Sequence, residues 1–277
     1  MLSVNALPLY EIVPNISEGR DASIVDACVD AVSKGGARVI DRTSDSVHHR
    51  SVITAVGSAD EVVAASVALA GVAAERIDLR SHAGVHPRIG ALDVLPFIAL
   101  RGATLADAGA LARKAAAQIW QRYRVPSYYY GAAATAEDGR TLPEVRRGGI
   151  PLDVGAHAHE SAGAIAIGAR DFLVAFNVEL ATGDVALARS IARMLRERDG
   201  GLTTLRALGL ARAPGIVQVS FNITDPEATP LYRVVELVRA LAAQAGIGIV
   251  RSELIGLVPR KALQATAAYY AHDEATL

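Results

Sequence analysis

The sequence contains only one cysteine, Cys28, among its 277 residues. A single cysteine excludes an intrachain disulfide and any zinc module built from several cysteines. Cys28 lies in a helical pattern, residues 21–34, with apolar residues three and four positions away. This pattern favours a buried packing role over a reactive thiol.

The chain also lacks an excess of charge of one sign and any long apolar run. Its 28 Lys and Arg residues nearly balance 29 Asp and Glu residues, so the net charge is −1. Without an overall basic field, no nucleic-acid partner is expected. Hydrophobic residues make up 51% of the sequence but occur in short runs interrupted by charge, so no membrane partner is expected. The first residues lack a basic stretch that leads into an apolar one, which predicts a cytoplasmic protein.

Two halves of the chain show the same order of predicted elements. In the first half, strand, helix, strand, strand, helix and strand are predicted at residues 9–13, 21–34, 37–41, 50–57, 59–77 and 93–100. A helix at 105–123 and a strand at 125–131 extend this half. The second half repeats the order at residues 172–180, 185–198, 202–210, 215–224, 230–245 and 246–257, and a last helix follows at 259–272.

This βαββαβ order is that of the ferredoxin-like arrangement. It predicts an α/β (α+β) fold of two such subdomains, whose mixed sheets face each other with helices outside. A crevice between two such units is a natural place for a ligand. The least regular stretch, residues 131–164, joins the halves and is expected to lie across that crevice.

Six of the seven histidines fall in three close pairs: His48 with His49, His82 with His86, and His157 with His159. Such clustering raises three alternatives, namely a metal site, an acid/base group and solvated loop residues. A helical zinc pair at His82 and His86 is disfavoured by Gly84 and Pro87, and Ala83 stands where the HExxH motif has its glutamate.

The acid/base alternative depends on the neighbours of His86. Pro87 restricts the backbone of His86 to extended conformations, and Arg88 points to the same side in an extended segment. A nearby cation keeps an imidazole neutral and can also bind a carboxylate. The combination suits a small anionic ligand.

Five segments, taken together and in order, resemble the glutamate formiminotransferase family, the transferase part of formiminotransferase-cyclodeaminase. They are "VPNISEGR" (13–20), "HRSVITAVG" (49–57), "IDLRSHAGVHPRIGALDVLPF" (77–97), "GAIAIGARDFLVAFN" (163–177) and "SELIGLVPRKAL" (252–263). The resemblance implies two subdomains, here residues 1–172 and 173–277, on either side of a folate site. It also implies transfer of a formimino or formyl group between N-formimino-glutamate, or a similar amino acid, and N5 of tetrahydrofolate.

The resemblance also assigns roles to particular residues. The histidine before Pro-Arg in the family's "GEHPR" motif is His86, which implies that His86 is the catalytic proton carrier. Asn15, Asp41, Arg50 and Arg88 match residues near the substrate. The implied folate-binding segment is Val154, Gly155, Ala156, His157, Ala158, His159, Glu160, Ser161, Ala162 and Gly163. Tetrahydrofolate is then the co-substrate, no metal is expected, and a homodimer is the expected assembly.

Three departures from the family pattern lie near the implied site. Val85 replaces a glutamate, Thr43 replaces an aspartate and His49 replaces an asparagine. They suggest a changed amino-acid substrate or altered folate contacts. Two other classes of function stay open, a noncatalytic homologue that binds folate or an amino acid, and a metal-dependent hydrolase that uses the clustered histidines.

Overall fold

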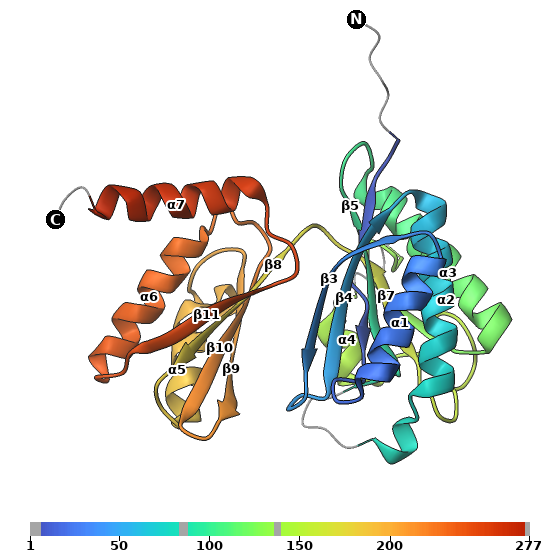
Figure 1. Cartoon of the computed structure of the whole chain (residues 1–277), viewed down its shortest axis with the longest axis horizontal. Coiled ribbons are helices and arrows are strands. Elements are labelled where there is room, and N and C mark those ends of the chain that lie inside the picture. Colours follow the sequence, from blue (N-terminus) through green and yellow to red (C-terminus); the bar gives the residue numbers. More distant parts are fainter. Residues whose placement is uncertain (1–6, 83–87, 136–139, 275–277) are drawn as a thin grey trace, which may run out of the picture. The chain divides into compact units, whose positions relative to one another are not determined.

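The computed structural model of the chain describes residues 7–82, 88–135 and 140–274. The chain divides into two compact units, residues 1–171 and 172–277, and each is considered by itself. Both units combine one β-sheet with helices packed on it (Figure 1). In unit 1, the short helix α4 (Leu142–Arg147) packs on the face opposite the three long helices. The predicted α/β class with two βαββαβ units is confirmed.

The sheet of unit 1 has a ferredoxin-like centre with two added strands. Its elements are β1 (Tyr10–Ile12), β2 (Asn15–Ile16), α1 (Ala22–Lys34), β3 (Arg38–Asp45), β4 (Arg50–Gly57), α2 (Ala59–Arg76), η1 (Leu79–Ser81), β5 (Leu92–Ala99), α3 (Leu105–Tyr123), β6 (Ser127–Gly131), α4 (Leu142–Arg147) and β7 (Ile165–Ala169). β1 and β2 both lie between β4 and β5 in antiparallel pairings, and β3 pairs with the other edge of β4. β7 and β6 continue the sheet beyond β5 in parallel.

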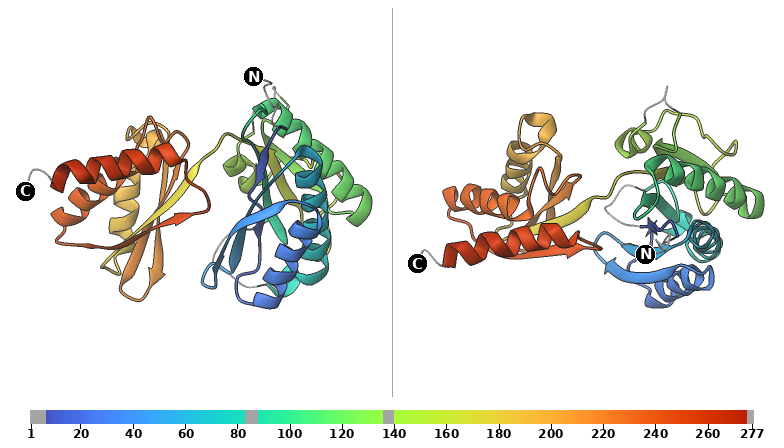
Figure 2. Two further views of the ribbon diagram at one scale, coloured as in Figure 1. Left: turned by 45° about the horizontal axis from the view of Figure 1, so that its top comes forward. Right: turned by 90° about the horizontal axis from the view of Figure 1, so that it is seen from above.

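The helices of unit 1 form because their starts are capped and their apolar sides are buried. Asp21 caps α1, and capping boxes begin α2 at Ser58 and α3 at Thr104. α1, α2 and α3 lie together on one face of the sheet (Figure 2). Cys28 is fully buried in this core, and burial raises the pKa of its thiol to about 12, so it is the packing residue that the helical pattern predicts.

Unit 2 is a four-stranded antiparallel sheet in the order β11-β8-β10-β9. Its elements are β8 (Val174–Leu180), α5 (Val185–Leu195), η2 (Glu197–Asp199), β9 (Leu205–Ala213), β10 (Ile216–Ile223), α6 (Leu231–Gln244), β11 (Ile249–Ile255) and α7 (Arg260–Glu274). α5 and α6 cover one face of this sheet, and α7 packs on α6 through stacked Tyr232 and Tyr269 rings with centroids 4.2 Å apart (Figure 1). Within the described ranges, no helix is both long enough and apolar enough to cross a membrane.

Some predicted boundaries in the chain were wrong. β7 was not predicted, because a five-residue run of small and apolar residues, buried throughout, has no alternation to mark it. β3 runs on to Asp45 rather than ending at residue 41, since its ladder with β4 continues to the pair Asp45 and Arg50. β9 begins at Leu205 instead of residue 202. The stretch expected to be irregular also contains the short helix α4.

Candidate functional site

Three of the predicted substrate residues share the face of the unit 1 sheet that α1, α2 and α3 leave uncovered. On β4, Ile53 and Ala55 are fully buried toward those helices, so Arg50 belongs to the opposite face. Asp41 and Asn15 pair with the β4 residues Thr54 and Val52 on that same face, which places both beside Arg50 in the sheet. An Arg50 Nη2–H donates to Oδ1 of Asn15, and Nδ2 of Asn15 donates to the Val13 carbonyl at 2.8 Å.

Arg50 is one of three guanidinium groups in this region. The second is Arg88, which contacts the His82 ring, and the third is Arg146 from α4. Arg146 Nη2 donates to Oδ2 of Asp93 at 2.7 Å. Burial, followed by the nearby charge of Arg146 and, to a smaller extent, that of Arg88, lowers the pKa of Arg50 to about 10. Burial also lowers the pKa of Arg88. The region is therefore cationic and suited to an anionic ligand.

Two histidine rings lie next to these arginines. The rings of His49 and His82 have centroids 4.1 Å apart. His82 Nε2–H donates to the Ser17 carbonyl at 2.7 Å, which leaves Nδ1 of His82 as the acceptor that faces Arg88. Nδ1 of His49 accepts the Gly19 N–H at 3.1 Å.

The surroundings of both rings favour their neutral forms. Burial is the largest cause that lowers the pKa of His49, and the carboxylate of Glu18 opposes it only in part. Burial also lowers the pKa of His82, followed by the charge of Arg88. Neutral imidazoles add no positive charge to the region, and both nitrogens of His82 are already engaged by Ser17 and Arg88.

Glu18, to which the sequence analysis assigns no role, joins several segments at this corner of the unit. Its Oε1 accepts the N–H groups of Gly19, Arg20 and Asp21 at 2.9, 2.7 and 2.9 Å. The same atom lies 3.3 Å from Nδ1 of His49. A carboxylate just before a helix start was the available signal, because such positions favour an anion. At Gly19, a Cβ would lie 2.3 Å from the Asp45 carbonyl oxygen, so only glycine allows the chains to approach this closely.

His86, the predicted catalytic residue, lies outside the described residues, as does the Val85 position. Its flanks are described. On one side, His82 is fixed by Ser17, and on the other, Ile89 donates its N–H to Oδ1 of Asp93 at 2.7 Å. The two residues that flank this gap, His82 and Arg88, therefore both belong to the cationic region.

The predicted folate-binding segment, residues 154–163, contacts both of those flanks. Ser161 accepts the Leu79 N–H at 2.8 Å, and Ala162 accepts the Ala91 N–H at 2.9 Å. Gly90 pairs with Gly163, and a Cβ on Gly90 would lie 1.9 Å from the Ala164 carbonyl oxygen. Backbone hydrogen bonds thus attach the segment to the chain on either side of residues 83–87.

Side chains within that segment behave differently from one another. Nδ1 of His159 accepts the Ala162 N–H at 3.1 Å, so this ring closes its own turn. His157 is exposed, and Glu160 pairs with Arg80 at 2.7 Å. Gly155 has φ of +89°, and a Cβ there would collide with the Trp120 ring.

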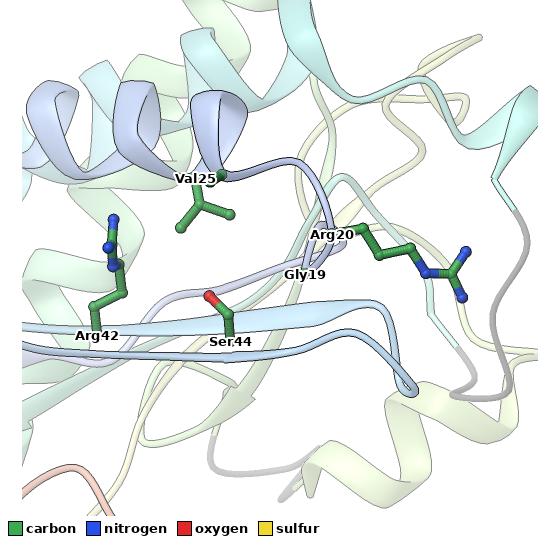
Figure 3. Close-up of a pocket in the computed structure, with 6 residues that line it drawn as sticks. Gly19, Arg20, Val25, Arg42 and Ser44 are labelled. Atoms are coloured by element: carbon green, nitrogen blue, oxygen red, sulfur yellow. The ribbon is translucent and has the colours of Figure 1, made fainter.

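A small pocket lies between the start of α1 and β3, next to the Glu18 corner. It has a volume of about 90 Å³ and is lined by Gly19, Arg20, Ala22, Val25, Arg42 and Ser44. Val25 and Ser44 point into it, whereas the Arg20 side chain extends away (Figure 3). Sites for drug-sized ligands measure roughly 300–1,000 Å³. This pocket is therefore not a pterin site. Among the described residues, no group of three or more His, Cys, Asp or Glu side chains is arranged to hold a metal ion.

Comparisons with known proteins bear on the whole chain. The model of the formiminotransferase domain, N-terminal subdomain, matches residues 9–170, and that of the formiminotransferase domain matches residues 175–277. The chain is 39% identical to a glutamate formimidoyltransferase of Thermoplasma acidophilum, over 95% of this chain and 92% of the relative. It is 36% identical to a glutamate formimidoyltransferase of Streptococcus pyogenes, over 96% of this chain and 94% of the relative.

A third relative is longer. The formimidoyltransferase-cyclodeaminase of Rattus norvegicus is 36% identical over 96% of this chain, and this chain spans 53% of its length. The matches to both subdomain models, in sequence order, confirm the resemblance on which the residue assignments were based. This chain is a member of the formiminotransferase family.

Proposed function

We propose that this protein is a folate-dependent transferase that moves a formimino group from an N-formimino-amino acid to N5 of tetrahydrofolate. The observation that carries the proposal is the match to both family subdomains, with two relatives named glutamate formimidoyltransferase aligned over nearly their whole length. The cationic face around Arg50, Arg88 and Arg146 supports it, because the amino-acid donor carries at least one carboxylate.

The reaction is an exchange of one carbon–nitrogen bond for another. The N5 lone pair attacks the formimino carbon, a new C–N bond forms, and a tetrahedral intermediate results. The bond to the amino-acid nitrogen then breaks, and that nitrogen gains a proton while N5 loses one. The proposed step has no oxidation or reduction and needs no metal, since one imidazole near neutral pKa can move the proton. His86 is the proposed proton carrier.

The remaining residues have binding roles in this proposal. Arg50 and Arg88 bind carboxylates, Asn15 orients the Arg50 guanidinium, and residues 154–163 bind the folate. Asp41 lies on the same sheet face and accepts a hydrogen bond from Thr43 Oγ1 at 3.4 Å, which leaves its other oxygen for a ligand donor.

Assembly and location belong to the same proposal. The protein is proposed to act as a homodimer in the cytoplasm, on small-molecule substrates, with subdomains at residues 1–172 and 173–277. Size-exclusion chromatography with light scattering tests the dimer directly.

A turnover screen tests the function. Purified protein is mixed with tetrahydrofolate and formimino-glutamate, formimino-aspartate or formimino-glycine, and both folate binding and release of the free amino acid are measured. Release that requires both tetrahydrofolate and one of these donors supports transfer. Folate binding without release with any donor would instead identify a noncatalytic binding protein. Release that needs no folate and stops with a chelator would identify a metal-dependent hydrolase.

A further inference from the structure

Arg146 reaches the open face of the unit 1 sheet from a helix that is held in place by packing. Its neighbour Val145 is buried in a small apolar cluster with Val94 and Tyr130. Thr141 and Glu144 form a capping box at the start of α4. These contacts fix the position from which the Arg146 side chain extends toward Asp93.

The ion pair of Arg146 and Asp93 satisfies the carboxylate but not the whole guanidinium. Asp93 is 2% exposed, and its two oxygens accept from Arg146 and from the Ile89 N–H, at 2.7 Å each. Nε of Arg146 is buried and has no hydrogen-bond partner among the described residues. A buried donor of a charged group that makes no hydrogen bond costs free energy, which an added acceptor would recover.

Arg146 of α4 and Arg50 of β4 each contact one of two paired strands. Asp93 precedes Val94 on β5, and Val94 pairs with Asn15, the residue that accepts from Arg50. Arg146 contacts Asp93 of β5, and Arg50 contacts Asn15 of β2. Because paired strands are about 4.8 Å apart, the two guanidinium groups are held near each other. The charge of Arg146 accordingly lowers the pKa of Arg50.

Carboxylates lie among these arginines, and two of them are already engaged. Asp93 and Asp45 act on Arg50 through their charges, and Asp41 lies beside it on the same sheet face. Asp45 is already engaged by the N–H groups of residues 47 and 48 and by Nδ1 of His48 at 3.0 Å. Nε of Arg146, buried and without a hydrogen-bond partner in the part of the chain that the structure describes, is the donor that a bound anion would satisfy.

We propose that Arg146 and Arg50 together form the site that binds a carboxylate of the formimino-amino acid, which makes Arg146 a donor-binding residue. The inference rests on the proposed function, because it names the group of that substrate which the site holds. Two guanidinium groups from different elements can bind the two oxygens of one carboxylate, and this fixes the donor's position.

The test compares three variants at residues 146 and 147 by steady-state kinetics. Arg146→Gln is expected to raise the KM for the formimino donor about 10- to 100-fold, the usual range for hydrogen bonds to charged groups, with less than about a twofold change in the KM for tetrahydrofolate. Arg146→Lys keeps the charge but loses the two-pronged geometry, so it should restore part of the affinity. Arg147→Gln is the matched control, because it removes the same charge from a side chain of α4 that is 73% exposed, and its kinetics should equal wild type.

A double variant separates binding from a purely structural role. Arg146→Gln leaves Asp93 buried without its cation, and Arg146→Gln with Asp93→Asn removes both charges. The double variant should regain thermal stability but keep the raised KM for the donor. A double variant with wild-type KM would overturn the inference, as would an Arg146→Gln protein that is folded and has an unchanged KM.

A binding measurement keeps this inference separate from the proposed function. Calorimetry with L-glutamate and formimino-glutamate, in the absence of folate, should show weaker binding for Arg146→Gln than for wild type and Arg147→Gln. If wild type shows no turnover but this pattern holds, the transferase proposal fails and the carboxylate site stands. If wild type binds neither compound, the carboxylate site is refuted.

Discussion

The two units build the same βαββαβ core and use it differently. Six of the seven histidines belong to unit 1, where Arg50 of β4 and Arg146 of α4 lie near each other. In unit 2, the charged centre of the sheet is the buried Glu179, which pairs with Arg212 at 3.3 Å and with Arg251 at 2.8 Å. The shared architecture thus fixes neither the charge nor the chemistry. Unit 1 keeps its histidines beside a group of arginines, whereas in unit 2 two arginines neutralise the buried carboxylate.

The largest expected effect is a loss of kcat from a substitution in unit 1, with no such loss from a control substitution in unit 2. His86→Ala should lower kcat about 10²- to 10⁴-fold, the usual contribution of a positioned acid/base group. Folate binding should stay within about a few-fold of wild type. Arg198→Ala in unit 2 is the control, since that side chain is 74% exposed. A His86→Ala protein with wild-type kcat would remove the proposed proton carrier.

The next largest effect is on the pH dependence of stability, which should differ between the buried Glu11 in unit 1 and the buried Glu179 in unit 2. Glu11 is 2% exposed, and burial raises its pKa to about 7, an effect that Arg170 opposes only in part. Because the folded-state pKa lies above the unfolded value, stability is complete below about pH 4.5 and declines as pH rises to about 7. Glu11→Gln removes this decline, so it should stabilise unit 1 by up to about 3 kcal/mol at pH 8 and by much less at pH 4.5.

Fluorescence gives a readout for unit 1 alone in that experiment. The only tryptophan, Trp120, belongs to α3. Urea unfolding followed by this signal at pH 4.5 and pH 8 measures the difference. Equal stabilisation at both pH values would show that the carboxyl group of Glu11 does not titrate with a raised pKa.

For Glu179 in unit 2, replacement by Gln should lower stability instead of raising it, and by a smaller amount. Hydrogen bonds from Arg251, followed by the charges of both arginines, lower the pKa of Glu179. The stability from this pairing is present above about pH 4.5 and is lost as pH falls through the lowered folded-state pKa. Glu179→Gln should therefore destabilise unit 2 by about 1–2 kcal/mol at pH 7, a value reduced from that of a buried pair because Arg251 is 52% exposed.

Circular dichroism during urea unfolding measures that loss. Wild type and Glu179→Gln should converge as the pH is lowered toward 3. A variant as stable as wild type at pH 7 would mean that the paired arginines do not depend on this carboxylate.

The smallest effect concerns the neutral histidine pair. Because burial lowers the pKa values of His49 and His82, stability is lost as pH falls from about 6.5 through the lowered folded-state values. His49→Asn should reduce this acid loss by less than about 1 kcal/mol, and asparagine tolerates the left-handed backbone of residue 49, where φ is +51°. His49→Ala should add a pH-independent loss of about 1 kcal/mol from that conformation. Melting temperatures at pH 7.5 and 5.5 compare wild type with both variants. Identical pH dependence in wild type and His49→Asn would contradict a lowered pKa of His49.

Local pattern was enough to predict the shared architecture. Capped amphipathic helices and alternating strands marked the βαββαβ order in both units. β7 was not predicted, because a run of small and apolar residues that is buried throughout shows no alternation of apolar and polar residues. Its place between β5 and β6 depends on parallel pairing with two strands that are distant in the sequence.

The site was less predictable, because its contacts join distant segments. Arg50 and Asn15 come together through the pairing of β2 with β4. Arg146 was not predicted, since nothing next to it in the sequence points to Asp93, 53 residues away. Stacking of His49 on His82 likewise depends on the fold. A pattern in the sequence identifies residues capable of chemistry, but only the register of the sheet shows which of them meet.

The most direct test of the account is the destination of the formimino carbon. A donor labelled with ¹³C at that carbon is incubated with the protein and tetrahydrofolate, and the products are followed by ¹³C NMR. The account predicts that the label moves to the folate and that free amino acid appears in equal amount, with neither product formed when tetrahydrofolate is omitted. Label released as formamide or formate, with or without folate, would show transfer to water and contradict it.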